Sequence, residues 1–487
     1  MYLGIDLGTS AVKAVLVDGS QRTVASAEAA LSVSRPFPGA SEQSPEQWWA
    51  AVVAVCAQLR AQAPAGWTQI RALGLSGQMH GAVLLDARRD VLRPAILWND
   101  GRSAAQCATL ERAVSDLPQI AGVRAMPGFT APKLLWAREH EPDVFRRVAR
   151  VLLPKDYLRW RLTGEFITDA SDAAGTLWLD QASRAWSTPL VAATGLVPEQ
   201  LPAIREGTQA TGVVSGPVAK ALGLAEGVIV AAGGGDAAAG AVGIGAVNAG
   251  DAFLSLGTSG QIFVATGDYR PSPDAMIHAF CHCVPSRWYR MAALLNGASC
   301  LAWVAHLLGE SDIEALLARV DATTDGSGEL LFLPYLSGER TPHNDPNARG
   351  VFFGLDGETS PESLVRAVLE GVAFAFAESA ECLASAGTAP ERFAVIGGGS
   401  RSSLWMRILA SALGRPLVRF EGSDTGPAFG AARLARIAIT GEPVDAVCAV
   451  PAVRDVVEPD PVLADRYRER GRRFRRLYRA LAPEFLR

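Results

Sequence analysis

The chain has 487 residues, of which 49% are hydrophobic and 20% are charged, and its formal net charge is -4. This length exceeds a single ordinary hydrophobic core and predicts two large domains, or three. The slightly acidic charge balance argues against a nucleic-acid binder and favours a small, soluble partner molecule.

The seven cysteines are scattered along the chain and do not form the pattern of a disulfide framework. We expect reduced thiols in a cytoplasmic protein. The chain opens directly on a strand pattern, without the basic and apolar regions of a signal peptide. The most apolar stretch, Val228–Ala249, contains Asp236 and Asn248 and consists mostly of small residues, so we expect no membrane span.

The first predicted element is a hairpin. Tyr2–Asp6 and Ala11–Val17 alternate as strands around a polar tip, Leu7–Ser10. Backbone N–H groups at such a tip can hold a phosphate, and Lys13 could add a positive charge. Asp6 would then have a role if a cation lay between its carboxylate and the phosphate. The alternative is a plain turn with a solvated aspartate.

A helix is predicted next, because Ser44–Gln47 is a capping box with proline at the first helical position. The apolar residues that follow share one face at helical spacing, and we expect both tryptophans to be core residues. This face comprises Trp48, Trp49, Val52, Val53, Cys56 and Leu59.

Two apolar runs then end in polar segments. Ile70–Leu75 leads into Ser76–Gly81, where His80 is placed as a ligand-contacting residue at a strand end or, alternatively, as a structural histidine. Pro94–Leu97 leads into Trp98–Arg102, which offers an aromatic face together with amide, carboxylate and guanidinium groups, a combination suited to a polyol.

Further along, Met126–Trp136 is a proline-broken lead into a helix, and its Lys133 is either a site group or exposed. Leu152–Asp172 has a helix-like pattern, and Asp169 and Asp172 suggest a turn rather than catalysis.

Val228–Gly240 predicts a strand, a tight turn and a helix. Three consecutive glycines, 233–235, allow positive φ and a close approach to the backbone. Asp236 falls at the position of a helix N-cap, which is its alternative interpretation.

The second half repeats the first. Leu-Gly-Thr-Ser occurs at Leu7 and again at Leu256, between the predicted strands Ala252–Leu256 and Gln261–Ala265. Ser360–Glu362 begins a helix through Ala380, as Ser44 did, and the strand Phe393–Ile396 again ends in a glycine turn. We infer a duplicated α/β domain whose two phosphate hairpins face each other, with Asp236 between them.

Three other segments have a composition that could serve a function. The polar, proline-rich Leu333–Gly350 is either a functional or a subunit-contact loop. The segment from Asp465 predicts an amphipathic helix with a basic outer face, for which membrane or nucleic-acid contact is the minor alternative. His278, Cys281, His282 and Cys283 lack the usual zinc spacing, so no metal site is expected there.

Taken together, the motifs resemble the FGGY carbohydrate kinases along essentially the whole chain. The residues that carry the resemblance are Gly4–Lys13, Gly77–Gly81, Ala95–Arg102, Met126–Trp136, Gly233–Asp236, Ser255–Gly260, Leu333–His343 and Ile396–Ser402. The resemblance implies the actin-like, ribonuclease-H-like duplicated α/β fold, with an N-terminal sugar-binding lobe (1–245) and a C-terminal nucleotide-binding lobe (246–487). It also implies ATP- and Mg²⁺-dependent phosphorylation of the 5-hydroxyl of D-xylulose, without a nucleic-acid or membrane partner, in a monomer or homodimer.

Residue by residue, the resemblance implies that Asp236 is the catalytic base, and that Asp6 and Asp236 lie near Mg²⁺. The sugar would contact Gln78, Met79, His80, Trp98, Asn99, Asp100 and Arg102. The nucleotide would contact Gly8, Thr9, Ser10, Lys13, Gly257, Thr258, Ser259, Gly297, Gly398, Gly399 and Ser402.

Ala237 departs from the family pattern, since many relatives carry Asn or Gln directly after the catalytic aspartate. This departure calls into question one sugar contact that the resemblance implies, and with it the tightness of binding or the identity of the sugar. A kinase for D-ribulose, L-xylulose or a polyol is the alternative within the family. A nucleotide-driven switch on the same fold is the alternative from another class, and a Rossmann oxidoreductase is disfavoured because no G-x-G-x-x-G follows the first strand.

Overall fold

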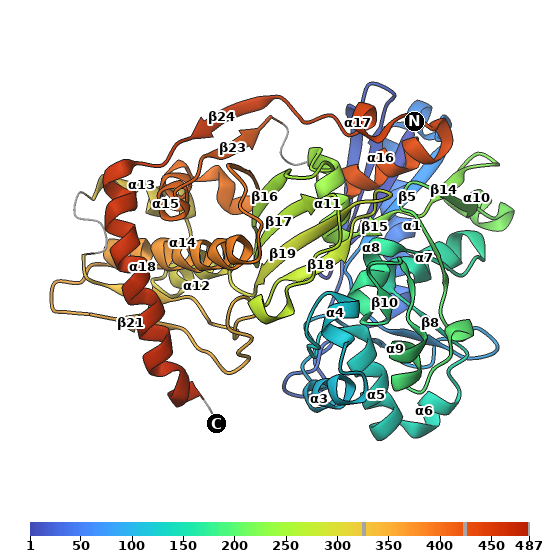
Figure 1. Cartoon of the computed structure of the whole chain (residues 1–487). Coiled ribbons are helices and arrows are strands. Elements are labelled where there is room, and N and C mark those ends of the chain that lie inside the picture. Colours follow the sequence, from blue (N-terminus) through green and yellow to red (C-terminus); the bar gives the residue numbers. More distant parts are fainter. Residues whose placement is uncertain (324–327, 422–425, 486–487) are drawn as a thin grey trace.

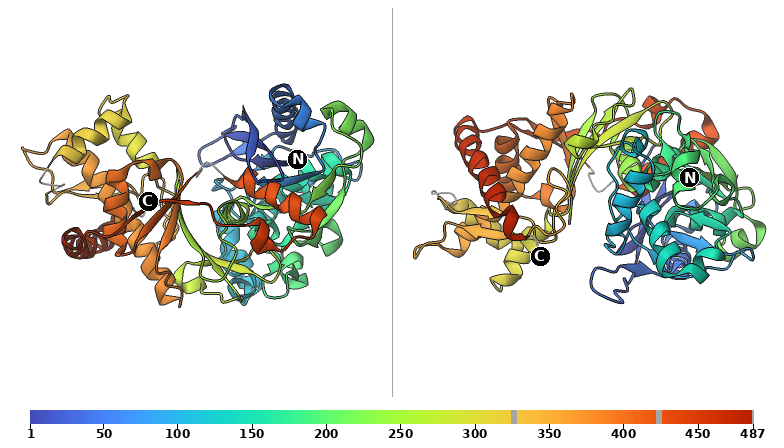
Figure 2. Two further views of the ribbon diagram at one scale, coloured as in Figure 1. Left: turned by 90° about the horizontal axis from the view of Figure 1, so that it is seen from above. Right: turned by 60° about the horizontal axis from the view of Figure 1, so that its bottom comes forward.

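Each predicted half of the chain forms a mixed β-sheet covered by helices. The structure, a computed structural model, describes residues 1–323, 328–421 and 426–485. The halves form two lobes that lie side by side, with the N-terminus on one and the C-terminus on the other (Figures 1 and 2).

The N-terminal sheet is built around the predicted first hairpin. Strand β1 pairs antiparallel with β2 and parallel with β5, and the order across the sheet is β13-β14-β5-β1-β2-β3. The short β15 pairs parallel with the end of β5, on the side where β14 pairs with the start of that strand. These strands are β1 (Tyr2–Leu7), β2 (Ala11–Val17), β3 (Thr23–Ala30), β5 (Ala72–Gly77), β13 (Ala210–Val213), β14 (Ile229–Ala231) and β15 (Gly234–Gly235).

The C-terminal sheet repeats this pattern, which confirms the internal duplication. Strand β16 pairs antiparallel with β17 and parallel with β22, in the order β18-β19-β17-β16-β22-β23-β24. The strands are β16 (Ala252–Leu256), β17 (Gly260–Thr266), β18 (His278–Cys281), β19 (Trp288–Leu294), β22 (Phe393–Ile396), β23 (Leu417–Phe420) and β24 (Val453–Val457).

The two Ser-Pro-Glu signals start helices as predicted. Helix α1 (Pro45–Gln62) follows Ser44, whose side chain makes no capping hydrogen bond, whereas Ser360 caps α14 (Pro361–Ser385) by accepting from the Ser363 N–H. The prediction for α1 was wrong for two residues. Trp49 is only half-buried and Val53 is exposed, because α1 presents a narrower face to the sheet than the apolar run suggested.

Helix α16 (Pro427–Thr440) returns from the C-terminal half to the N-terminal sheet, where it packs on β1, β5 and α11 (Asp236–Ile244) (Figure 1). Glycines make the close approach possible: a Cβ on Gly4 would lie 1.9 Å from the Ala428 carbonyl oxygen, and one on Gly74 would lie 1.9 Å from that of Ala431. The division near residue 245 remains a prediction, and α16 lies beyond it in sequence but beside the N-terminal sheet.

The tail helix α18 (Pro461–Leu481) begins before the predicted Asp465 and runs along the outer face of the C-terminal lobe (Figure 1). Its expected apolar face is confirmed by the buried Tyr467 and Phe474. Its basic face is interrupted, because Arg470 is buried and forms an ion pair with Glu370 at 3.0 Å.

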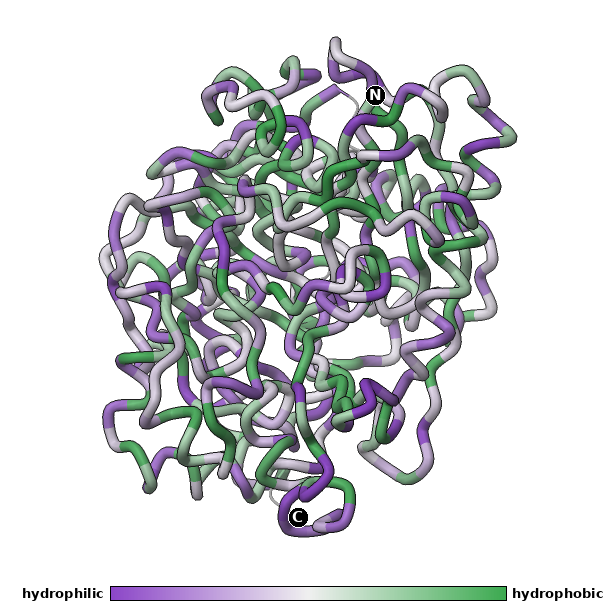
Figure 3. The backbone as a smooth tube through the Cα atoms, turned by 90° about the vertical axis from the view of Figure 1, so that its right-hand side faces the viewer, coloured by the Kyte–Doolittle hydropathy of each residue, from purple (hydrophilic) through white to green (hydrophobic). Residues whose placement is uncertain are grey.

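Hydrophobic and hydrophilic stretches alternate along the trace (Figure 3), and within the described residues no helix combines the length and apolarity that a membrane span requires.

The remaining N-terminal elements are β4 (Glu42–Gln43), α2 (Pro64–Trp67), β6 (Val83–Leu85), β7 (Ala95–Ile96), α3 (Ala104–Ala113), α4 (Leu117–Ala121), α5 (Thr130–His140), α6 (Pro142–Arg146), β8 (Arg150–Leu152), α7 (Pro154–Thr163), β9 (Ile167–Asp169), α8 (Ala170–Ala173), β10 (Leu179–Asp180), β11 (Ala185–Trp186), α9 (Thr188–Ala193), β12 (Ala203–Arg205) and α10 (Gly216–Leu222). The others are α12 (Ser299–Leu307), α13 (Ile313–Ala322), β20 (Leu331–Leu333), β21 (Val351–Phe353), α15 (Ser403–Leu413) and α17 (Val444–Val447).

Candidate active site between two hairpins

Asp236 is the first residue of α11 and follows the predicted glycine turn. Gly233 has φ 75°, and its backbone lies against β5, where an added Cβ would be 1.9 Å from the Leu75 carbonyl oxygen. The alternative interpretation of Asp236 as the N-cap was wrong by one residue, because Gly235 occupies that position. The Asp236 carboxylate nevertheless accepts from the Ala237 N–H at 2.7 Å and so satisfies one N–H of the first helical turn.

The environment of Asp236 disfavours its ionised form. The side chain reaches solvent, yet the surrounding protein removes hydration, and this desolvation together with the negative charge of Asp6 raises its pKa to about 7. Asp6, at the end of β1, is 9% exposed, and burial raises its pKa to about 6 against the lowering effects of Ser76 and Lys13. Two carboxyl groups with raised pKa values thus lie near each other.

The segment after β5 lies directly against this turn. A Cβ on Gly235 would lie 2.9 Å from Cγ and Sδ of Met79, so the buried Met79 packs on the backbone next to Asp236. His80 is buried with φ 70°, its ring lies on Phe129 at 4.4 Å, and its Nδ1 lies 2.7 Å from the Gly175 carbonyl oxygen. Because a carbonyl only accepts, Nδ1 carries the proton and Nε2 is left as an acceptor.

The tip of the first hairpin joins the same group of residues. The Thr9 hydroxyl donates to Gln78 Oε1 at 3.0 Å and accepts from Trp98 Nε1 at 2.9 Å. Gln43 adds a bond from its amide to the Thr9 carbonyl at 2.7 Å. Sequence reasoning did not single out Gln43, because it lies in a segment with no recognisable pattern. The structure therefore brings the predicted hairpin tip and the two predicted sugar segments together.

Several predicted site residues are engaged elsewhere. Asp100 and Arg102 form a buried ion pair at 2.7 Å, and Arg102 also pairs with Glu42 at 2.7 Å, while Asn99 is exposed. Lys13 lies 3.8 Å from Glu28 on β3, with more than half of each side chain exposed. Their roles at a ligand remain predictions, and the ion pairs show that Asp100 and Arg102 already satisfy each other.

The second hairpin tip is packed against the predicted nucleotide residues. The Gly297 N–H donates to the Thr258 carbonyl at 3.0 Å, and a Cβ on Gly297 would lie 2.7 Å from the Gly257 carbonyl oxygen. Gly397 has φ 93°, and an added Cβ there would be 2.6 Å from Leu256, so the turn after β22 also reaches this tip. Thr258 and Ser259 are exposed.

A pocket of about 820 Å³ lies beside this second tip. Its wall includes Ala298, Gly398, Gly399 and Ser402, and the Ser402 hydroxyl also caps α15 by accepting from the Trp405 N–H. Three residues predicted to contact the nucleotide thus share one concave wall, and the rest of the lining comes from α12, α13 and the start of α15.

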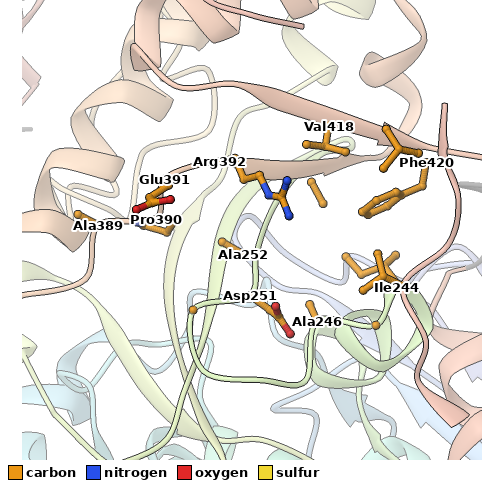
Figure 4. Close-up of a pocket in the computed structure, with 15 residues that line it drawn as sticks. Ile244, Ala246, Asp251, Ala252, Ala389, Pro390, Glu391, Arg392, Val418 and Phe420 are labelled. Atoms are coloured by element: carbon orange, nitrogen blue, oxygen red, sulfur yellow. The ribbon is translucent and has the colours of Figure 1, made fainter. Parts of the chain in front are cut away.

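A second pocket, of about 430 Å³, is set where the chain passes between the lobes (Figure 4). It is lined mainly by apolar residues, with Asp251, Glu391 and Arg392 drawn among them. Its described lining contains none of the predicted site residues.

Arg340 was missed by sequence reasoning. It comes from the polar loop between β20 and β21, and its guanidinium lies 5.5 Å from the centre of the Trp98 ring and 3.5 Å from the Trp98 carbonyl oxygen. The loop was predicted to be either a functional or a subunit-contact loop, and its partner in the other half could not be identified from local sequence. It thus connects the two lobes at a predicted sugar residue.

Lys133 is neither exposed nor paired with a carboxylate: it is buried and donates to the carbonyls of His80 and Gly128 at 2.7 Å each. Within the described residues, no group of three or more histidine, cysteine, aspartate or glutamate side chains could hold a metal ion.

Comparisons with known proteins identify the family of this chain. The N-terminal domain of the FGGY family of carbohydrate kinases matches residues 1–243, and its C-terminal domain matches residues 252–439. The chain is 50% identical to a xylulose kinase of Escherichia coli (strain K12), covering 99% of each sequence.

Two solved structures extend the comparison. One described as a xyloylose kinase from Brucella ovis has a TM-score of 0.94 and 48% identity, covering 99% of each chain. A xylulose kinase from Rhodospirillum rubrum has a TM-score of 0.90 and 33% identity, covering 100% of each. The expected actin-like, duplicated α/β fold is confirmed, and the chain belongs to the FGGY family of carbohydrate kinases.

Proposed function

We propose that this chain transfers the γ-phosphoryl group of ATP to the 5-hydroxyl of D-xylulose, giving D-xylulose 5-phosphate and ADP. The substrate is suggested by the relatives, which are named as xylulose kinases. The observation that supports the chemistry is the closeness of two carboxyl groups, Asp236 with a pKa of about 7 and Asp6, whose negative charge contributes to that raised pKa.

In this proposal Asp236 is the general base. Its carboxylate accepts the proton of the sugar hydroxyl while the hydroxyl oxygen forms a bond to the γ-phosphorus, and the bond from that phosphorus to the bridging oxygen of ADP breaks. A pKa near 7 keeps Asp236 able to accept a proton at neutral pH. Its base strength exceeds that of an ordinary aspartate.

Met79 and His80 bind and orient the sugar in this proposal. Met79 packs on Gly235 and so shapes the space next to the base. The neutral His80 offers Nε2 as an acceptor for a sugar hydroxyl, because Nδ1 is committed to Gly175. The backbone N–H groups of the two hairpin tips, at Thr9–Ser10 and Gly257–Ser259, hold the phosphates, a function that needs donors without mobile side chains. The Gly8 N–H already donates to the Ala11 carbonyl at 3.0 Å, so Gly8 serves the turn itself.

The residues present fit a magnesium ion. Asp6 Oδ1 is buried and makes no hydrogen bond within the described part of the chain, and oxygen ligands are those that Mg²⁺ prefers. Asp6 and Asp236 would hold the ion, which when bound neutralises charge on the transferring phosphates. Its binding also relieves the repulsion between the two carboxylates.

The test is ADP release measured with the purified chain over a panel of ketoses and polyols, with product identified by phosphorus NMR. D-xylulose should give the highest kcat/KM. A higher kcat/KM with D-ribulose or L-xylulose would show that this sugar, and not D-xylulose, is the preferred substrate. The comparison matters because Ala237 lacks the amide side chain that many relatives carry at this position. ADP release that no sugar stimulates would favour the nucleotide-driven switch.

A further inference from the structure

A buried group of charged side chains lies directly behind the turn that carries Asp236. Lys155 Nζ lies 2.6 Å from Asp156, 3.0 Å from Asp169 and 3.4 Å from Asp172, and Arg159 belongs to the same group. All five side chains are completely buried. The mechanism above uses none of them, and the sequence suggested only a turn at Asp169 and Asp172.

Such a group is not required for stability alone, because packed apolar side chains of similar volume stabilise a core at least as well as buried ions. Charged side chains differ from apolar ones because their hydrogen bonds are directional, so that each donor or acceptor holds its partner at a defined angle and distance. The contacts of this group with the backbone therefore indicate what it orders.

Arg159 fixes the segment that enters the turn. Its guanidinium donates to the carbonyl of Ala231 at 2.7 Å and to that of Ala232, and also to the Thr211 hydroxyl at 2.6 Å. Thr211 in turn donates to the Val230 carbonyl at 2.8 Å. The carbonyls of three consecutive residues before Gly233 are thus held from one side.

Ser171 fixes the residue before Asp236. The Gly235 N–H donates to Ser171 Oγ at 3.1 Å, and Ser171 Oγ donates to Asp169 Oδ2 at 2.5 Å. The other oxygen of Asp169 lies 3.0 Å from Lys155 Nζ. A continuous path of polar contacts therefore runs from the buried lysine to the amide next to the base.

Strand β5 already restrains one side of this turn, because Gly234 and Gly235 pair with Ser76 and Gly77. Glycines have no side chains that packing could lock, so contacts from the other side are needed to fix their conformationally permissive backbone. A catalytic group must be held within about 0.5 Å of its productive position. We propose that Ser171 and Arg159 are positioning residues that hold the glycine turn and so aim Asp236, an inference that rests on the proposed function.

Ser171→Ala in the full-length chain tests this most gently, because it removes one hydroxyl and leaves the charges in place. We expect kcat to fall by about 10- to 100-fold, while KM for ATP and for the sugar stays within about twofold. Thr168→Val is the matched control: Thr168 is buried three residues away on β9, and its hydroxyl makes no hydrogen bond within the described residues. Its kcat should equal that of the wild type.

Two further variants separate positioning from general damage. Arg159→Lys keeps the charge but cannot hold two carbonyls and the Thr211 hydroxyl in the same fork geometry, and it should also lower kcat without changing KM. The double variant Ser171→Ala with Asp236→Asn should have the same kcat as Asp236→Asn alone. The reason is that the orientation of residue 236 no longer affects kcat once the base is removed.

Hydrogen exchange supplies a readout that does not depend on turnover. The peptide that spans the turn should exchange about 10-fold faster in Ser171→Ala than in Thr168→Val, with the rest of the chain unchanged. Equal kcat and equal exchange in these two variants, both folded, would overturn the inference. A wild type that phosphorylates no sugar would overturn the proposed function, and the exchange result would still decide whether Ser171 orders the turn.

Discussion

The carboxyl group of Asp6 lies close enough to Asp236 for its charge to contribute, after desolvation, to the raised pKa of Asp236. The arrangement follows from the sheet: Ser76 on β5 pairs with Asp6 on β1 and with Gly234 on β15, so the ends of three neighbouring strands meet at this point. The register of these strands therefore places the proposed base, Asp236, near the proposed metal ligand, Asp6.

The first prediction concerns pH. Because Asp236 must be ionised to accept a proton, kcat/KM for the sugar should rise with increasing pH and then level off. The pKa of Asp236 is about 7 without a bound cation, and Mg²⁺ held by Asp6 and Asp236 would place the midpoint of this rise below pH 7. Initial rates of ADP release at saturating ATP and Mg²⁺, measured between about pH 5.5 and 8.5, check this expectation. A value of kcat/KM that falls as pH increases over this range would contradict Asp236 as the base.

The second prediction concerns stability. Asp6 has a folded pKa of about 6, above its ordinary 3.8, so the native state binds the extra proton and loses stability as pH rises through this window. Asp6→Asn should therefore raise the free energy of unfolding by about 3 kcal/mol above pH 7, with little effect near pH 4. Denaturant unfolding at both pH values measures the difference.

A related prediction concerns the stabilisation of the protein by magnesium. The ion should raise the melting temperature of the wild type more at about pH 8 than at pH 5, since it binds the ionised carboxylates. It should have a much smaller effect on Asp6→Asn. Equal stabilisation of both proteins would remove Asp6 from the metal site.

The third prediction concerns the nucleotide side. Gly297→Ala places a Cβ 2.7 Å from the Gly257 carbonyl oxygen and would displace the second hairpin tip. KM for ATP should rise about 10-fold, equivalent to about 1.4 kcal/mol, while KM for the sugar is unchanged. Gly267→Ala is the control, because its Cβ would meet its nearest neighbour at an ordinary 3.8 Å. A rise in both KM values would show a general disturbance instead.

The fourth prediction concerns the contact between α16 and α11. A Cβ on Gly430 would lie 1.8 Å from the Ala239 carbonyl oxygen, inside the backbone of the helix that carries Asp236. Gly430→Ala should therefore destabilise the chain by about 1–3 kcal/mol or more. Gly426→Ala, which has open space around the new Cβ, should have the same melting temperature as the wild type. Matching melting curves for the two variants would refute the tight packing.

Much of the fold could be predicted because its signals are local. Proline at the first position of a helix marked α1 and α14, and alternation marked both hairpins. The glycine turn before Asp236 predicted a junction between a strand and a helix. This prediction did not require knowing which residues the turn contacts. The repeated Leu-Gly-Thr-Ser then related the two halves.

The remaining features depend on partners far apart in sequence. Asp100 and Arg102 were predicted to face a sugar, but Glu42, nearly 60 residues earlier, completes an ion pair that local composition does not encode. Arg340 reaches Trp98 from the other lobe. The same holds for Ser171, whose hydroxyl meets Gly235 only because the chain folds back between them.

The most direct test of the account is the turnover of Asp236→Asn. Asparagine preserves the shape of the side chain and cannot accept the proton of the sugar hydroxyl, so sugar-dependent ADP release should fall by about 10²–10⁴-fold. ATP affinity, measured by titration calorimetry, should be retained. A folded Asp236→Asn protein that binds ATP and turns over at nearly the wild-type rate would contradict the assignment of Asp236 as the base.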